Sequence, residues 1–153
     1  MDAANGGEHN NIAIGTNALG GELGNADYCI AIGHQALILQ NADVKNTAIG
    51  GLAGDAITSG TGNTFVGYLS GSAASTTHNN TALGDSALGG CTGASNVAVG
   101  HGAGNAAMTG SDNTLMGFAA GQGLLGGAGN VVIGKSAGAA MTTGDYNIAI
   151  GFN

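Results

Sequence analysis

The chain has 153 residues, with 32 glycines, no proline or tryptophan and only three Phe and three Tyr, which excludes an ordinary core of large side chains. Disorder is also excluded, because 43% of the residues are apolar and only 7% are charged. The net charge of −7, with Lys45 and Lys135 as the only Lys or Arg residues, excludes nucleic acid and anionic membranes as partners, since both require clustered basic side chains.

The first segment, residues 1–9, is polar and precedes any repeated pattern. It has no basic stretch followed by an apolar one, and no apolar run in the chain approaches the length of a membrane span. We therefore expect no secretion signal or anchor in this sequence. Residues 1–9 are a candidate attachment segment in front of a single repeat domain, residues 10–153.

One motif, Asn-(Thr/Ile/Val)-Ala-(Ile/Val/Leu)-Gly, recurs along the whole repeat domain at intervals of 16 to 18 residues. Its glycines, here called the repeat glycines, are predicted to mark a sharp bend or a close approach between neighbouring repeats. They are Gly15, Gly33, Gly50, Gly67, Gly84, Gly100, Gly117, Gly134 and Gly151.

Four residues before each repeat glycine lies an asparagine, except at Cys29 in the second repeat. Asparagines at one level of successive repeats are predicted to form a structural ladder, in which each amide bonds the next. These ladder positions are Asn11, Cys29, Asn46, Asn63, Asn80, Asn96, Asn113, Asn130 and Asn147.

A repeat near 17 residues is too short for a helical hairpin or a propeller blade, which need about 33 residues or more. It suits one coil of an all-β parallel solenoid with two short strands, because β-branched segments alternate with clusters of Gly, Asn, Thr and Asp. We predict nine such coils. At a spacing of about 4.8 Å they form a body roughly 38 Å tall.

In several repeats the segment before the repeat glycine is apolar at three consecutive positions, as in Ile12-Ala13-Ile14 and Val131-Val132-Ile133. Because side chains alternate along a strand, both faces of this strand are predicted to be dry. One face lies inside the coil, so the other needs a partner, which we expect to be further copies of the chain in a homotrimer. The middle residue is alanine in six of nine repeats, which suggests that it faces the trimer axis.

At these residues the chain resembles the left-handed parallel β-roll repeats of trimeric autotransporter adhesin heads. It is still more similar to the Asn-Thr-Ala-Ile-Gly arrays of phage fibres and virion proteins, as residues 46–54 and 96–104 illustrate. The resemblance covers nearly all of residues 10–153. It implies a left-handed coil and a homotrimer. The resemblance is specific for this architecture and does not specify a biological role.

Two short motifs match nucleotide-binding patterns but are interpreted as accidents of the repeat. Residues 129–136 match G-x-x-x-x-G-K-S, yet the middle is a Val-Val-Ile strand where a phosphate-binding loop needs free backbone N–H groups. Residues 121–126 match G-x-G-x-x-G, which a glycine-rich chain produces by chance. We predict no catalytic residue, no cofactor and no metal.

Cysteine and histidine offer two further candidates. Cys29 and Cys91 lie about three coils apart, roughly 15 Å, too far for a disulfide within one chain, so both are predicted to be buried free thiols. His34 and His101 each follow a repeat glycine. On a three-fold axis such a histidine could form a metal site. The simpler interpretation is a variable rim position.

The function that this sequence favours is that of a non-enzymatic structural protein on a phage virion surface. It would be a trimeric capsid decoration protein or a compact tail fibre, with capsid, tail or host-surface components as partners. The alternative is the head of an adhesin on a bacterial cell surface. A minor alternative is an ice-binding solenoid, because Thr47, Thr64 and Thr81 share one level, although Ile or Val breaks the row in other coils.

Overall fold

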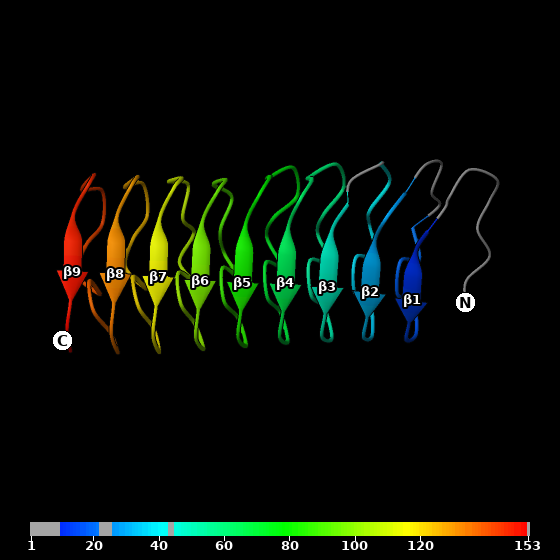
Figure 1. The fold of residues 1–153 in the computed structure, drawn as a ribbon, viewed down its shortest axis with the longest axis horizontal. Helices are drawn as coiled ribbons and strands as arrows, with labels where there is room; N and C mark the ends of the chain where they lie inside the picture. Colours follow the sequence, from blue (N-terminus) through cyan, green and yellow to red (C-terminus); the bar gives the residue numbers. More distant parts are fainter. Residues whose placement is uncertain (1–9, 22–25, 43–44, 153) are drawn as a thin grey trace.

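The computed structural model describes residues 10–21, 26–42 and 45–152, so the attachment segment proposed for residues 1–9 lies outside the described residues. These residues form nine strands of three residues each, joined into one parallel sheet in chain order (Figure 1). The predicted all-β parallel solenoid is therefore confirmed. The strands are β1 (Ile12–Ile14), β2 (Ile30–Ile32), β3 (Thr47–Ile49), β4 (Thr64–Val66), β5 (Thr81–Leu83), β6 (Val97–Val99), β7 (Thr114–Met116), β8 (Val131–Ile133) and β9 (Ile148–Ile150).

The sheet keeps one register from end to end, because every strand is the same three-residue part of the repeat. Ile12, Ala13 and Ile14 of β1 pair with Ile30, Ala31 and Ile32 of β2, and each later pair follows the same alignment. Single-residue changes in repeat length are therefore absorbed in the connections. The strands lie side by side along the long axis, with the turns above and below them (Figure 1).

The number of turns and the number of strands per coil differ from the prediction. Nine strands are joined by eight connections, so the solenoid has about eight turns and the ninth repeat contributes its strand alone. Among the described residues the returning half of each coil holds no second strand. It contains left-handed residues such as Leu52 and Gly54 (φ +58° for both), a conformation that a strand does not contain.

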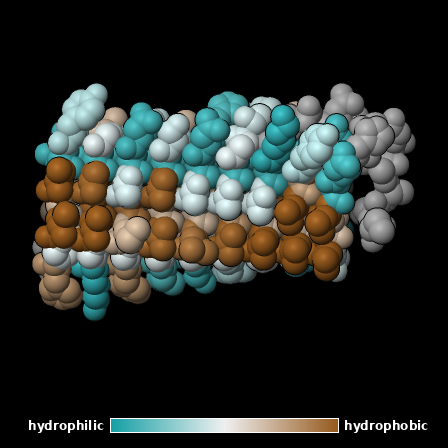
Figure 2. Space-filling model, viewed as in Figure 1, coloured by the Kyte–Doolittle hydropathy of each residue, from teal (hydrophilic) through white to brown (hydrophobic). Residues whose placement is uncertain are grey.

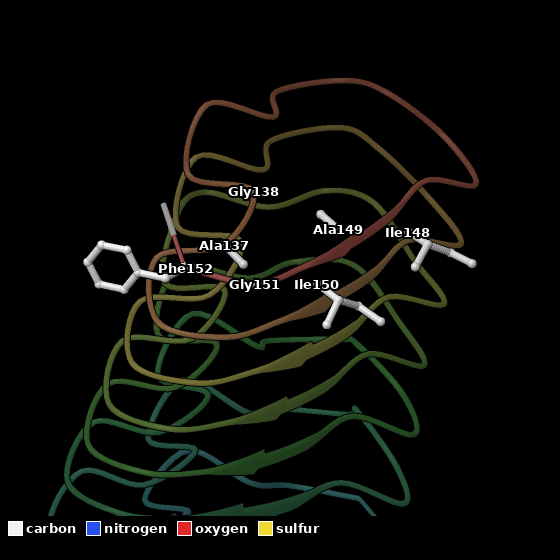
Figure 3. Close-up of a pocket in the computed structure, with 7 residues that line it drawn as sticks. All are labelled: Ala137, Gly138, Ile148, Ala149, Ile150, Gly151 and Phe152. Atoms are coloured by element: carbon white, nitrogen blue, oxygen red, sulfur yellow. The ribbon is translucent and has the colours of Figure 1, made fainter.

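The middle residue of each strand points into the coil, which corrects the prediction that it faces a partner. From β2 to β8 this residue is fully buried and belongs to one continuous core, as Ala31, Phe65 and Leu115 show. Figure 3 shows the same direction in β9, where Ala149 points inward and Ile148 and Ile150 point outward. Small residues are common at this position because the interior of the coil is narrow.

The core is filled by complementary choices at the middle residue and at a second position, four residues after the repeat glycine. Of the five coils that have alanine in the strand and reach the second position, three place leucine there and two place glycine. The leucines are Leu19, Leu37 and Leu88, and the glycines are Gly54 and Gly104. Coils with a large strand residue place glycine there, as Phe65 with Gly71 does. Where both positions are small, side chains of neighbouring coils lie against the glycine: Leu37 and Phe65 at Gly54, and Leu88 and Leu115 at Gly104. The core is therefore filled between coils as well as within each one.

Candidate functional site

The repeat glycines form a row that no other residue can occupy. Their φ values lie between +126° and +143°, a region that L side chains rarely adopt. From Gly15 to Gly134, a Cβ would also meet the carbonyl of the repeat glycine in the next coil; at Gly15 it would lie 2.6 Å from the Gly33 oxygen. The strand therefore ends in a bend at which neighbouring backbones touch.

The asparagines form a second row, which is buried in the coils from β3 to β8. The amide N–H of Asn113 donates to Oδ1 of Asn96 (2.9 Å), and Nδ2 of Asn113 donates to the same oxygen (3.1 Å). Nδ2 of Asn96 donates to the carbonyl of Gly110 in the following coil (3.0 Å). Each asparagine thus joins one coil to the next through both ends of its amide.

Cys29 interrupts this row, and Gln40 bridges the gap. Nε2 of Gln40 donates to Sγ of Cys29 (2.7 Å), and Oε1 of Gln40 accepts from Nδ2 of Asn46 (3.2 Å). Gln40 is fully buried. A buried amide without a partner is costly. Gln40 supplies Asn46 with the acceptor that an asparagine in place of Cys29 would provide.

The outward face of the sheet is formed by the first and third residues of each strand, not by the middle residue as predicted. The first and third residues of every strand point out of the coil and form two rows, here called the apolar strip. In the third row every residue is aliphatic or Met, and large side chains remain exposed: Ile14 by 59%, Leu83 by 49% and Met116 by 44%. Figure 2 shows this row as an unbroken hydrophobic band along the molecule.

The members of the strip are fixed by the strand register. The first row is Ile12, Ile30, Thr47, Thr64, Thr81, Val97, Thr114, Val131 and Ile148. The third row is Ile14, Ile32, Ile49, Val66, Leu83, Val99, Met116, Ile133 and Ile150. No charged residue occurs at any of these positions, so the strip can bind an apolar surface but cannot perform acid or base chemistry.

The residues that follow the repeat glycines form an exposed row beside the strip. The rings of His101 and Phe118 stack with their centroids 5.2 Å apart. Nζ of Lys135 lies over the rings of both Phe118 and Phe152, at 5.8 and 5.6 Å from their centroids. These contacts run along the solenoid axis and hold the row together across four coils.

The described residues contain no group of three or more His, Cys, Asp or Glu side chains that could hold a metal ion. His34 and His101, which the metal hypothesis uses, are exposed and belong to coils four repeats apart. A single chain therefore offers at most one histidine at each level. Within the same residues no helix is long and apolar enough to cross a membrane.

The segment that matches a phosphate-binding loop is built into the sheet. Residues 131–133 form β8, as predicted. The N–H groups of Gly129, Val131, Gly134 and Ser136 all donate to carbonyls of neighbouring coils. They cannot cradle a phosphate without breaking the sheet. In the Gly-rich match at residues 121–126, the N–H groups of Gly121, Leu124 and Gly126 are likewise bonded within the fold.

One hollow, of about 350 Å³, lies at the end of the solenoid that carries β9. Figure 3 shows Ala137, Gly138 and Ala149 on its inner side, with Phe152 beside them. The other lining residues are Ile148, Ile150 and Gly151. None of these side chains can act as a nucleophile, an acid or a base, so this hollow offers no catalytic group.

Cys29 and Cys91 are buried and unbonded to each other, as predicted. Burial raises the pKa of the Cys91 thiol, against weaker opposing effects from bonds to Gly93 and Asn96. Burial also raises the pKa of the Asp55 carboxyl, one oxygen of which has no hydrogen-bond partner. Neither group lies beside a second reactive side chain in the described contacts.

The chain gives no significant match to known protein families, curated proteins or solved structures.

Proposed function

We propose that this chain is a non-enzymatic structural protein that acts as a left-handed, homotrimeric rod on the surface of a phage virion. The observation that carries the proposal is the apolar strip. A monomer with a band of exposed Ile, Val, Leu and Met along its whole length exposes apolar surface that association would bury. Three copies that bring their strips together would bury this surface around a common axis.

The strip alone is smaller than the surface that each partner buries in a stable two-copy interface, which favours an assembly in which each copy has two neighbours. Eight coil spacings of about 4.8 Å and a width of about 12 Å give roughly 450 Å² for each copy. That is about half of the ~800 Å² per partner that a stable interface buries. A copy that touches two neighbours around an axis also buries the borders of its strip, which a closed trimer achieves.

Light scattering at micromolar concentration tests the assembly. We expect a particle mass three times the 14.5 kDa of one chain. Leu83→Glu together with Val99→Glu places charges at the centre of the strip and should leave a folded monomer. The matched control is Leu125→Glu, because Leu125 is 46% exposed but lies outside the strip. A monomeric wild-type chain would contradict the proposal.

Location is tested on intact particles with an antibody against this chain. Label on the capsid supports a decoration protein, and label on the tail supports a compact fibre. An adhesin head is the alternative, because it would use the same rod and the same self-association. A translocator domain encoded downstream, together with unlabelled virions, would favour the adhesin.

Ice binding would compete for the same surface. Thr47, Thr64 and Thr81 lie in the outward row of adjacent strands, where an ice-binding protein would need them exposed to water. A trimer that buries the strip leaves no such face. We therefore expect no thermal hysteresis in a nanolitre osmometer; measurable hysteresis from a monomeric chain would favour ice binding.

A further inference from the structure

Neighbouring coils are joined by two backbone hydrogen bonds that recur at every junction of the sheet. The N–H of the first strand residue donates to the carbonyl of the following ladder residue, as Val131 does to Asn147 (2.9 Å). The N–H of a repeat glycine donates to the third strand residue of the preceding coil, as Gly151 does to Ile133 (2.9 Å). Each junction therefore needs one donor and one acceptor from each coil.

At the two ends of the sheet these groups are left over in complementary positions. On β9, the N–H of Ile148 has no acceptor and the carbonyl of Ile150 has no donor among the described residues. On β1, the carbonyl of Asn11 has no donor and the N–H of Gly15 has no acceptor within the same residues. One end therefore offers the groups that the other end lacks, and an open strand edge of this kind is a template for a further strand.

The asparagine ladder ends in the same complementary way. Inside the molecule, the N–H of each ladder residue donates to Oδ1 of the asparagine before it, as Asn147 does to Asn130 (2.8 Å). Oδ1 of Asn147 accepts from no described residue, and the N–H of Asn11 donates to none. Asn130 is buried, whereas Asn147 is exposed. A further coil on β9 would give Asn147 the surroundings that the inner asparagines have.

The two end strands have the same sequence, Ile-Ala-Ile, and carry none of the Lys or Pro residues that protect an open edge. The same two sequences already pair in this structure, because β1 and β2 are both Ile-Ala-Ile and align in register. Pairing of β9 with another β1 would repeat that contact. It would also continue the apolar strip, in which Ile148 and Ile150 are 75% and 70% exposed.

The core is open at the end that carries β9. Ala149 is only partly buried, although the middle residue of every strand from β2 to β8 is fully buried. The hollow at this end exposes Ala137, Gly138 and Ala149 (Figure 3). These are small apolar groups that a further coil would cover, so stacking would remove apolar surface from water as well as pair the backbone.

We propose that the β9 edge of one copy binds the β1 edge of a second copy, end to end and in the same direction, so that one sheet continues across the junction. The Ile148 N–H would donate to the Asn11 carbonyl of the second copy. The N–H of its Gly15 would donate to the Ile150 carbonyl. The N–H of the same Asn11 would donate to Oδ1 of Asn147.

This end contact is separate from the contact of the apolar strips, because a monomer and a trimer both present the two ends. It is also small. Two strands of three residues bury far less than the ~800 Å² per partner of a stable interface. We therefore expect stacking at about 1 mM chain and not at micromolar concentration.

Small-angle X-ray scattering of the Leu83→Glu, Val99→Glu variant, from about 10 μM to about 1 mM, tests the stacking without lateral contacts. The largest dimension should grow in steps of about 43 Å, nine coil spacings, while the cross-section stays constant. Lateral association would instead widen the cross-section. A length that does not change over this range would overturn the proposal.

Ile148→Pro in the same background removes the donor of the edge. A proline is tolerated on an edge strand when the missing N–H faces the open side. This variant should not elongate. The matched control Ile148→Val keeps the N–H and should elongate like its parent. Equal elongation of both variants would overturn the pairing.

Hydrogen exchange in the wild-type chain tests the bonds without any substitution. The amides of Ile148 and Gly15 should exchange at least about tenfold more slowly at 1 mM than at micromolar concentration. The amide of Thr76, which is exposed and bonded to no described group, should not change. Unchanged exchange at Ile148 and Gly15 would contradict the proposal.

Deletion of residues 1–9 separates the strand edge from the segment that precedes it. The three bonds involve only residues 11–15 and 147–150, so the shortened chain should still elongate. Loss of elongation would show that residues 1–9 make the contact and would overturn the β1 edge as the binding site. A monomeric wild type at micromolar concentration would contradict the proposed trimer and leave the end contact standing.

Discussion

Phe65 lies directly against Gly71 inside the fourth coil, so closely that a Cβ at Gly71 would overlap the aromatic ring. Gly71 also has a left-handed backbone (φ +61°). The contact explains why the coil with the largest strand residue has glycine at the second core position. It also makes the packing of one coil testable without disturbing the sheet.

The first prediction concerns this pair. Gly71→Ala should lower the free energy of unfolding by about 3 kcal/mol, because overpacking adds to the left-handed strain. The control is Gly102→Ala, where φ is +64° but nothing lies within 4 Å of the new Cβ. That change should cost about 1 kcal/mol, from backbone strain alone. Urea unfolding measures both, and equal losses would show that the ring contact is unimportant.

A compensating change follows from the other coils. Phe65→Ala alone should cost about 4 kcal/mol by leaving a cavity. Adding Gly71→Leu recreates the arrangement of Ala31 with Leu37, where the leucine adopts a φ of +52°. The double variant should therefore be more stable than either single variant, as judged by urea unfolding. Additive losses would mean that the two positions do not share one space.

The asparagine row gives the next prediction. Asn96→Ala removes the acceptor of the Asn113 N–H and the donor to the Gly110 carbonyl, leaving both groups buried and unpaired. Two such groups should cost about 3 kcal/mol in unfolding free energy. Asn105→Ala, at an exposed position, should change stability by less than about 0.5 kcal/mol. Thermal or urea unfolding gives the comparison, and similar losses at both sites would refute a structural role for the row.

The sequence was sufficient for the strands and their register because one motif recurs at every coil. The sequence did not show which face of the strand points into the coil, because a strand such as Ile12-Ala13-Ile14 is apolar on both faces. The pairing of the middle strand residue with the residue at the second core position does indicate which face is inside. Phe65 occurs with Gly71 and Leu115 with Gly121, whereas Ala82 occurs with Leu88. Such size compensation indicates that both positions lie in one core, although the pairs Ala48 with Gly54 and Ala98 with Gly104 do not follow it.

The single strand of each coil was not predictable from composition. The returning segment contains leucines that resemble strand residues, yet Leu37 and Leu88 adopt left-handed conformations. Tertiary packing imposes this, because the side chain must reach a narrow core while the backbone turns. The apolar strip could not be predicted either, because its residues are as apolar as the core residues and only the structure shows which of them point out of the coil.

Asp55 supplies a prediction on pH. Burial raises its pKa from the ordinary value of 3.8, so the folded protein takes up a proton at a higher pH than the unfolded chain. This group therefore adds stability as the pH falls through the raised pKa, and the gain is complete below 3.8. Asp55→Asn removes the charge. It should raise the melting temperature at pH 7 relative to wild type, and the difference should shrink towards pH 3.

A melting temperature that falls equally at both pH values would show that the carboxylate, despite its unpartnered oxygen, makes contacts the amide cannot replace. The useful control is Asp112→Asn, because Asp112 is exposed. In the background of the monomeric variant Leu83→Glu with Val99→Glu, Asp112→Asn should change the melting temperature little at either pH. Using that variant separates the stability of the coil from the assembly of copies.

The two thiols provide the last test. Cys29 and Cys91 are 0% and 1% exposed, so iodoacetamide at pH 8 should modify neither in the native protein and both in urea. Because burial raises the pKa of Cys91 above 9.0, the folded state keeps its proton where the unfolded chain loses it. The stability due to this group is therefore complete below pH 9.0 and is lost as the pH rises through the raised value. Labelling of native protein should accelerate only under these alkaline conditions, as mass spectrometry would show. Rapid modification of one thiol at pH 8 would mean that the coil around it opens far more readily than its packing indicates.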